Sequence, residues 1–201
     1  MAIANKPAQF FAMTCLNPPF RPLPLVLVPF LLVFTDPSLG ARLGDQNSDE
    51  LVDRVCRGSD DYYFCVSTLN SDHRTPNADL VGLAQISVDV TTKDLTSTYN
   101  YIEVLLKKTT DPRMKRDLGQ CSGFYDTARN ATLDASKAVA RKDFAEVVTD
   151  AQLVGAAVGD CQDVFRAENP PLASPLKEQN QNAIDLATIV NSAANLLRGS
   201  H

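Results

Sequence analysis

Cysteines are the residues of this chain with the most definite chemistry. Outside the first 40 residues there are four of them: Cys56, Cys65, Cys121 and Cys161. In a secreted chain an even number of cysteines indicates disulfide bonds, here with three possible pairings. A zinc site is the competing interpretation, but no Cys-x-x-Cys spacing exists and the only histidines are His73 and His201. The sequence therefore predicts two disulfide bonds and neither a metal nor another cofactor.

Groups that could carry out catalysis are scarce. A Ser/His/Asp site would depend on His73, which follows Asp72 in a polar stretch and has no partner at a fitting spacing. A cysteine nucleophile is excluded if both disulfide bonds form. Gly155 and Gly159 lie inside a helical pattern, where close helix packing explains them better than a phosphate-binding loop does. We therefore expect a protein that is not an enzyme.

One modification motif is present. Asn130-Ala131-Thr132 matches the N-glycosylation sequon. Asn130 lies two positions after Ala128, which belongs to an apolar helical stripe, so its side chain is expected to face outward. The alternative is an ordinary exposed asparagine. If the chain is secreted, the sequence predicts a glycan at Asn130.

The N-terminal residues predict secretion. Residues 22–34 form a 13-residue apolar run, which is too short to span a membrane but suits the core of a signal peptide. Small residues place its cleavage close to Ala41, so we expect a signal peptide at 1–40 that takes Cys15 with it. A disordered proline-rich arm is the alternative, and a start at Met13 would give a leader of more usual length. Secretion would place the four remaining cysteines in an oxidising compartment.

A heptad pattern runs through residues 114–165. Its first half is a stripe of apolar and small residues at offsets that alternate between four and three: Met114, Leu118, Cys121, Tyr125, Ala128, Thr132, Ala135 and Val139. After a polar break the pattern resumes with Phe144, Val147, Ala151, Val154, Val158, Cys161 and Phe165. Two such stripes joined by a short break predict an antiparallel helical hairpin. Residue 141, midway between Cys121 and Cys161, lies in the break, so the pattern predicts that these cysteines pair.

A shorter hairpin is predicted at residues 47–76 by the same argument. Asn47 opens a capping-box pattern at the start of one helix, and Asp60 can cap the next. The turn at Asp60 lies midway between Cys56 and Cys65. These two cysteines are therefore expected to form the second disulfide bond.

The remaining segments complete a bundle. A long helix begins at Asp79 and has a weak middle, because residues 91–98 are rich in Ser and Thr. Asp111-Pro112 and Ser174-Pro175 each combine a cap with a proline suited to a helix start. Residues 78–198 therefore form four long helices with short connections. This pattern predicts an all-α fold, an up-down-up-down four-helix bundle preceded by the short disulfide-linked hairpin.

Together, several of these motifs resemble the plant family of invertase and pectin methylesterase inhibitors. The matching features are Cys56-x8-Cys65 with Asp60-Asp61-Tyr62-Tyr63-Phe64 inside it, Ala78-Asp79-Leu80, Cys121-Ser122-Gly123-Phe124-Tyr125-Asp126-x-Ala128, Lys142-Asp143-Phe144, Asp160-Cys161-Gln162-Asp163-x-Phe165, and the helix after Ser174-Pro175. The resemblance covers residues 47–198 and is most marked to the plane-tree pollen allergens that bear the invertase-inhibitor name. It implies one inhibitor domain at 41–201.

The resemblance also implies a secreted protein of the apoplast or cell wall that binds a carbohydrate-active enzyme one to one and blocks its cleft. Relatives that inhibit invertase insert a loop bearing Pro-Lys-Phe, which lies between the second and third bundle helices. The corresponding candidate target-binding loop here is Lys142, Asp143 and Phe144, with Asp143 in place of the lysine. Carboxylates in an invertase site would repel this acidic group, which favours pectin methylesterase as the target.

Relatives that inhibit pectin methylesterase use outward faces of the second and third bundle helices, here about Arg129 to Asp150. Three alternatives remain open: inhibition of cell-wall or vacuolar invertase, a non-inhibitory pollen or cell-wall protein with the same fold, and an Asp143 that only caps a helix while Phe144 continues the stripe. The chain has 24 acidic and 19 basic residues and no basic stripe, so neither nucleic acid nor membrane is expected as a partner.

Overall fold

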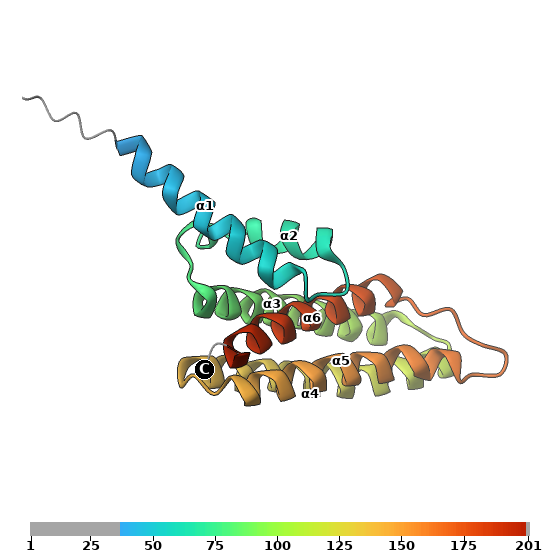
Figure 1. Cartoon of the computed structure of the whole chain (residues 1–201). Coiled ribbons are helices and arrows are strands. Elements are labelled where there is room, and N and C mark those ends of the chain that lie inside the picture. Colours follow the sequence, from blue (N-terminus) through green and yellow to red (C-terminus); the bar gives the residue numbers. More distant parts are fainter. Residues whose placement is uncertain (1–36, 200–201) are drawn as a thin grey trace, which may run out of the picture. The chain divides into compact units, whose positions relative to one another are not determined.

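The regular elements in the computed structural model, which describes residues 37–199, are all helices (Figure 1). In chain order they are α1 (Pro37–Cys56), α2 (Tyr62–Asn70), the 3₁₀ helix η1 (Thr75–Asn77), α3 (Leu80–Lys108), α4 (Pro112–Ala140), α5 (Phe144–Arg166) and α6 (Lys177–Gly199). The apolar run at 22–34 lies outside the described residues, so the signal peptide at 1–40 stays a prediction.

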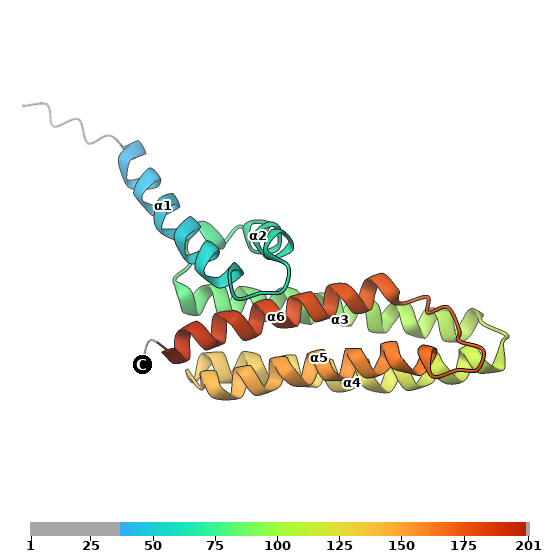
Figure 2. The same ribbon diagram turned by 45° about the vertical axis from the view of Figure 1, so that its right-hand side comes forward.

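Helices α3 to α6 form the predicted up-down-up-down bundle. Each packs against its two neighbours in the order α3, α4, α5, α6 and back to α3, and the helices lie side by side in Figures 1 and 2. Short connections at 109–111 and 141–143 force antiparallel neighbours, and a longer one at 167–176 leads into α6. The predicted fold class is confirmed.

The heptad stripes of α4 and α5 point into the core as predicted. Every stripe position is buried except Met114, which is only partly covered near the start of α4. Tyr125 and Phe165 are among the largest side chains with almost no exposed surface. Burial of one large apolar side chain contributes roughly 1.5–3 kcal/mol to folding, so these stripes contribute strongly to the stability of the bundle.

Both predicted disulfide bonds are present. Cys56 and Cys65 join α1 to α2 with their Cα atoms 5.4 Å apart, and Cys121 and Cys161 join α4 to α5 at 4.7 Å. These separations lie in the range that a disulfide bond can bridge without backbone movement. The side chains of all four cysteines are buried.

The helix starts were predicted with mixed success. Asp111 caps α4 as expected, and Asp79, where the long helix was expected to begin, caps α3, because both carboxylates accept backbone N–H groups of the first turn. The prediction for Asp60 was wrong by one residue, since Asp61 caps α2 by accepting the N–H of Phe64. The prediction for Asn47 was also wrong: α1 begins at Pro37, a residue suited to the first helical position, so Asn47 lies inside the helix.

Buried hydroxyl groups along α3 find hydrogen-bond partners within the helix itself. Ser87 and Thr91 are buried, and their hydroxyl groups donate to the carbonyl oxygens of Ala84 and Ser87 at 2.8 and 2.7 Å. Buried hydroxyl groups satisfied in this way cost little, so the polar stretch can pass through the core.

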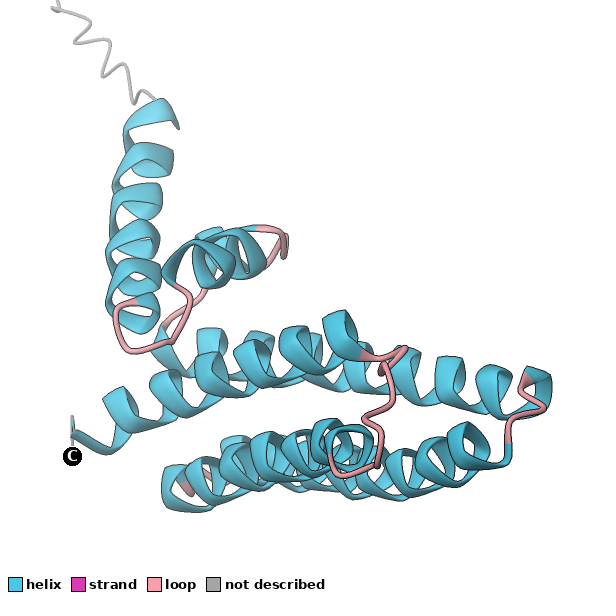
Figure 3. Cartoon of the chain, turned by 90° about the vertical axis from the view of Figure 1, so that its right-hand side faces the viewer, coloured by secondary structure: helices cyan, strands magenta, loops and turns pink. Residues whose placement is uncertain are grey.

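The α1–α2 hairpin packs on one side of the bundle. Figures 1 and 3 show it against α3 and α6 and away from α4 and α5. The hydroxyl group of Ser192 on α6 donates to the carbonyl oxygen of Val55 at 2.6 Å, and a Cβ atom at Gly58 would collide with that hydroxyl oxygen. Glycine is therefore needed where the hairpin turn approaches α6.

Candidate functional site

The turn between α4 and α5 holds the candidate target-binding loop. Two backbone hydrogen bonds fix this turn. The N–H of Lys142 donates to the carbonyl oxygen of Val139 at 3.0 Å, and the N–H of Asp143 donates to the carbonyl oxygen of Ala138 at 2.9 Å. Lys142 has a φ of 62°, an uncommon conformation for a residue with a side chain, and its side chain is exposed. Asp143 caps α5, because its carboxylate accepts the N–H of Glu146 at 3.2 Å.

Phe144 differs from the other two candidate loop residues, because it is buried. Its side chain is only 4% exposed and belongs to the core that also holds Val139 and Val147. A phenylalanine in this position cannot contact a partner unless the start of α5 leaves the core. The prediction of a three-residue binding loop therefore needs correction at Phe144, whereas Lys142 and Asp143 stay available at the surface.

The exposed surface beside the turn is a second candidate, and we call it the α4–α5 outer face. It consists of the exposed residues Asn130, Leu133, Asp134, Lys137, Arg141 and Leu153 together with the partly buried Glu146 and Asp150. Leu133 and Leu153 are 50% and 44% exposed. Singly exposed apolar side chains are common on protein surfaces, so this face is a candidate for its place beside the turn and for the apolar surface that a partner could cover.

Ion pairs organise the polar part of the outer face. Lys137 lies 2.8 Å from Asp134 on α4, and Arg141 pairs with Glu146 across the turn. Burial raises the pKa of Asp150, and the negative charges of Glu146 and Asp134 raise it further. One carboxylate oxygen of Asp150 is buried and has no hydrogen-bond partner among the described residues. This carboxylate is therefore the least stable anion of the face.

The charges of this region balance. Residues 129–150 contain four basic and four acidic side chains. At one edge, the guanidinium group of Arg129 stacks over the ring of Tyr99 at 4.6 Å and pairs with Asp126 at 3.6 Å. The face is thus close to neutral, held in place by local contacts, and marked mainly by its two exposed leucines.

Asn130 is exposed on α4, as the sequence predicts for a glycan acceptor. Thr132, the third residue of the sequon, is 3% exposed, and its hydroxyl group donates to the carbonyl oxygen of Arg129 at 2.8 Å. Glycosylation itself stays a prediction.

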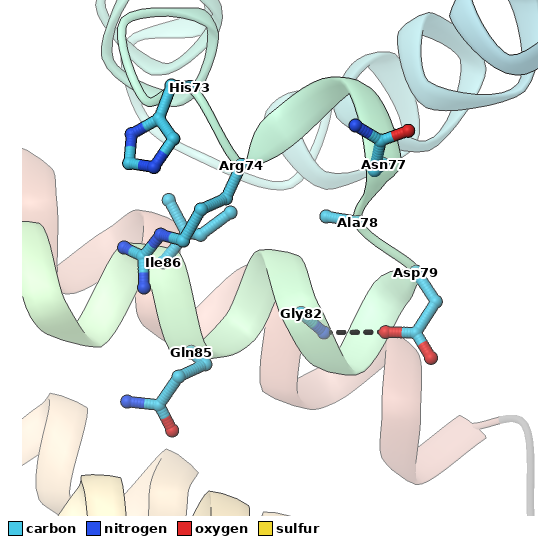
Figure 4. Close-up of a pocket in the computed structure, with 8 residues that line it drawn as sticks. All are labelled: His73, Arg74, Asn77, Ala78, Asp79, Gly82, Gln85 and Ile86. Atoms are coloured by element: carbon cyan, nitrogen blue, oxygen red, sulfur yellow. Dashed lines mark hydrogen bonds between the residues drawn. The ribbon is translucent and has the colours of Figure 1, made fainter.

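A pocket of about 730 Å³ lies between the segment after α2 and the start of α3 (Figure 4). Its histidine, His73, has a side chain that is 93% exposed and lies 3.8 Å from Asp72. Arg74 binds Asp72 and Asp89, both at 2.7 Å, and hydrogen bonds from Arg74 hold the pKa of Asp72 far below its usual range. Asp79 caps α3. The charged groups here are thus already paired, and the pocket offers no activated nucleophile.

The described residues suggest neither a metal site nor a membrane span. Within 37–199 no three side chains of the metal-binding types gather, and no helix is long and apolar enough to cross a bilayer.

Sequence reasoning missed the two exposed leucines of the outer face. Leu133 follows the stripe residue Thr132, and Leu153 precedes the stripe residue Val154. A large apolar residue one position off a heptad stripe was the available signal, because such a residue must lie at the edge of the buried surface or outside it.

Comparison with known proteins gives a consistent result. The family model described as plant invertase/pectin methylesterase inhibitor matches residues 50–195. A "Putative invertase inhibitor" of Platanus orientalis is 31% identical over 139 residues, which cover 68% of this chain and 79% of that protein. A "Pectinesterase inhibitor" of Actinidia deliciosa is 29% identical over 171 residues, which cover 85% of this chain and 91% of that protein. A crystal structure of a mutant pectin methylesterase inhibitor from Arabidopsis has the same fold, with a TM-score of 0.63, 20% identity and coverage of 71% and 93%.

Proposed function

The chain belongs to the plant invertase/pectin methylesterase inhibitor family, and we propose that it inhibits pectin methylesterase by placing the α4–α5 outer face across the cleft of that enzyme. It is a proteinaceous inhibitor of cell-wall enzymes and not itself an enzyme. The choice of target and of surface is the proposed part.

The position of Phe144 is the observation that carries this choice. Inhibition of invertase through the loop would need an accessible phenylalanine next to a basic residue. Here Phe144 is buried in the core and Asp143 caps α5, which leaves Lys142 as the only exposed basic side chain of the three candidate loop residues. These features favour a helix face over an inserted loop.

The outer face has the properties that such docking requires. Leu133 and Leu153 offer apolar surface whose burial against a partner would be favourable. The balanced charges of residues 129–150 avoid strong repulsion by either sign of charge on the partner. The ion pairs Lys137–Asp134 and Arg141–Glu146 restrict side-chain motion before binding, which lowers the entropic cost of association.

The predicted cellular context fits this target. We propose that the signal peptide at 1–40 directs the chain to the apoplast and that one inhibitor binds one enzyme molecule. The two disulfide bonds support secretion, because such bonds persist in oxidising compartments.

Inhibition of invertase is the second candidate, and the similarity to a protein named as an invertase inhibitor favours it. The two candidates are separated by incubating the refolded chain 41–201 with pectin methylesterase and, separately, with invertase. We expect loss of methylesterase activity and unchanged invertase activity. Inhibition of invertase alone would favour the second candidate, and inhibition of neither would favour a non-inhibitory wall protein.

A variant pair tests the surface. Leu133→Arg should weaken inhibition about tenfold or more, because it replaces exposed apolar surface of the outer face by a charge. Val104→Arg is the matched control, since Val104 is 42% exposed on α3 and lies outside the outer face. Equal inhibition by both variants would contradict docking through α4 and α5.

A further inference from the structure

The predicted glycan acceptor occupies the middle of the exposed side of α4. Exposed residues recur along this side at Asp126, Asn130, Asp134 and Lys137, spaced by one helical turn, and Leu133 lies three residues after Asn130. Asn130 therefore shares its surface with the residues that carry the proposed docking, rather than lying on a remote part of the bundle.

The structure also indicates when the glycan must be added. The transfer needs an accessible hydroxyl group at the third sequon position. In the folded helix Thr132 is 3% exposed, and its hydroxyl group is bonded to the carbonyl oxygen of Arg129. Attachment to Asn130 must then precede the folding of α4, so each molecule leaves the secretory pathway either with or without the glycan.

The chemistry is the ordinary one for a sequon. The amide nitrogen of Asn130 attacks the anomeric carbon of an oligosaccharide carried on a lipid pyrophosphate. A nitrogen–carbon bond forms, the carbon–oxygen bond to the pyrophosphate breaks, the amide loses one proton, and the lipid pyrophosphate leaves. No oxidant or reductant takes part.

We propose that a glycan at Asn130 blocks the α4–α5 outer face, so that the glycosylated chain is a poor inhibitor and the unmodified chain is the active one. This inference rests on the proposed function. A bulky hydrated glycan that emerges one turn from Leu133 and Asp134 prevents a partner from approaching the helix. It leaves the fold intact, because Asn130 points away from the core.

Expression in a secreting eukaryotic host, followed by separation of the glycosylated and unmodified forms, tests this inference. The glycosylated chain should inhibit pectin methylesterase about tenfold less strongly, or worse, than the Thr132→Val variant from the same host, which loses the sequon at a buried position and keeps Asn130 on the surface. Removal of the glycan by an endoglycosidase that leaves a single sugar should restore most of the inhibition. Thr132→Ser keeps the sequon and should behave as the wild-type chain.

A glycan placed elsewhere is the matched control. Asp79→Thr creates a sequon at the exposed Asn77, and threonine can still cap α3. Combined with Thr132→Val, this change gives a chain whose single glycan lies outside the outer face. It should inhibit as strongly as Thr132→Val alone.

The outcomes separate the two proposals. Equal inhibition by the glycosylated chain and by Thr132→Val would overturn the glycan inference and leave the proposed function standing. Absence of any glycan on the secreted chain would overturn the inference as well. Failure of Thr132→Val to inhibit methylesterase would instead contradict the proposed function itself.

Discussion

The two helical hairpins of this molecule are each closed by one disulfide bond, but they are stabilised differently. In the α4–α5 hairpin, fourteen of the fifteen heptad positions are buried, and α3 and α6 cover its flanks. In the α1–α2 hairpin, whose side chains are described from residue 47, the buried apolar residues besides the two cysteines are Val52, Val55 and Leu69. The first hairpin is held by packing along its whole length, and the second by a small contact area and its disulfide bond.

This difference indicates that the two hairpins open under different conditions. Segments with few buried contacts open locally at a lower free energy than the whole domain. A nine-residue helix such as α2 is also marginal in water without support. We therefore expect the α1–α2 hairpin to loosen first, while α4 and α5 keep the outer face rigid.

The largest effect should come from the disulfide bond of the well-packed hairpin. Replacing Cys121 and Cys161 by alanine removes a crosslink that closes a long loop, which should lower the free energy of unfolding by about 4 kcal/mol. Denaturant unfolding followed by circular dichroism measures this change. A loss below about 1 kcal/mol would mean that packing alone accounts for the hairpin.

A smaller and more local effect is expected at the other hairpin. Replacing Cys56 and Cys65 by alanine should cost about 2.7 kcal/mol, because the closed loop is shorter. In hydrogen exchange, the amides of Tyr62–Asn70 should lose protection while those of α4 and α5 keep theirs. Simultaneous loss of protection in all helices would show that the two hairpins unfold as one unit.

The contact between the short hairpin and α6 gives the third prediction. Gly58→Ala should destabilise the protein by about 1–3 kcal/mol, because the added Cβ atom collides with the hydroxyl oxygen of Ser192. Ser192→Ala removes that oxygen and its bond to Val55, at a cost of about 1 kcal/mol. The double variant should lose less free energy of unfolding than the two single variants lose together. Strict additivity would mean that the two residues do not meet.

The smallest effect should be a pH dependence at Asp94, where α2 covers α3. Asp94 lines a pocket of about 360 Å³ with Phe64 and Leu186, and burial raises its pKa to about 6. The folded state therefore favours the protonated carboxyl group. Stability from this group is greatest below pH 3.8, its ordinary pKa, and is lost as pH rises through 6. Asp94→Asn should flatten this decline in unfolding measurements from pH 4 to 7, whereas Glu178→Gln on the surface of α6 should not.

The sequence predicts the α4–α5 hairpin better than any other part. Regular offsets from Leu118 to Phe165 leave one possible buried side, and the polar break fixes the turn, so both helices and their disulfide bond follow from local pattern. The same logic gives the cap at Asp111 and the start of the long helix at Asp79, because each is followed directly by a helical pattern.

Features that depend on contacts distant in sequence were not predictable. The buried Asn180 accepts a hydrogen bond from the hydroxyl group of Tyr125 at 2.8 Å, a pairing across the core that no spacing suggests. Likewise, the buried hydroxyl group of Ser192 donates to the carbonyl oxygen of Val55, which lies 137 residues earlier in the chain. Phe144 was expected at a binding surface on family resemblance, although its place in the heptad pattern already indicated burial.

Mapping the surface that the target covers tests the central proposal most directly. Hydrogen exchange of the chain should be compared with and without pectin methylesterase. Docking through the outer face predicts slower exchange within residues 129–153, while the amides of Tyr62–Asn70 remain as in the free chain. Protection confined to α1 and α2, or to the turn at 141–143 alone, would contradict it.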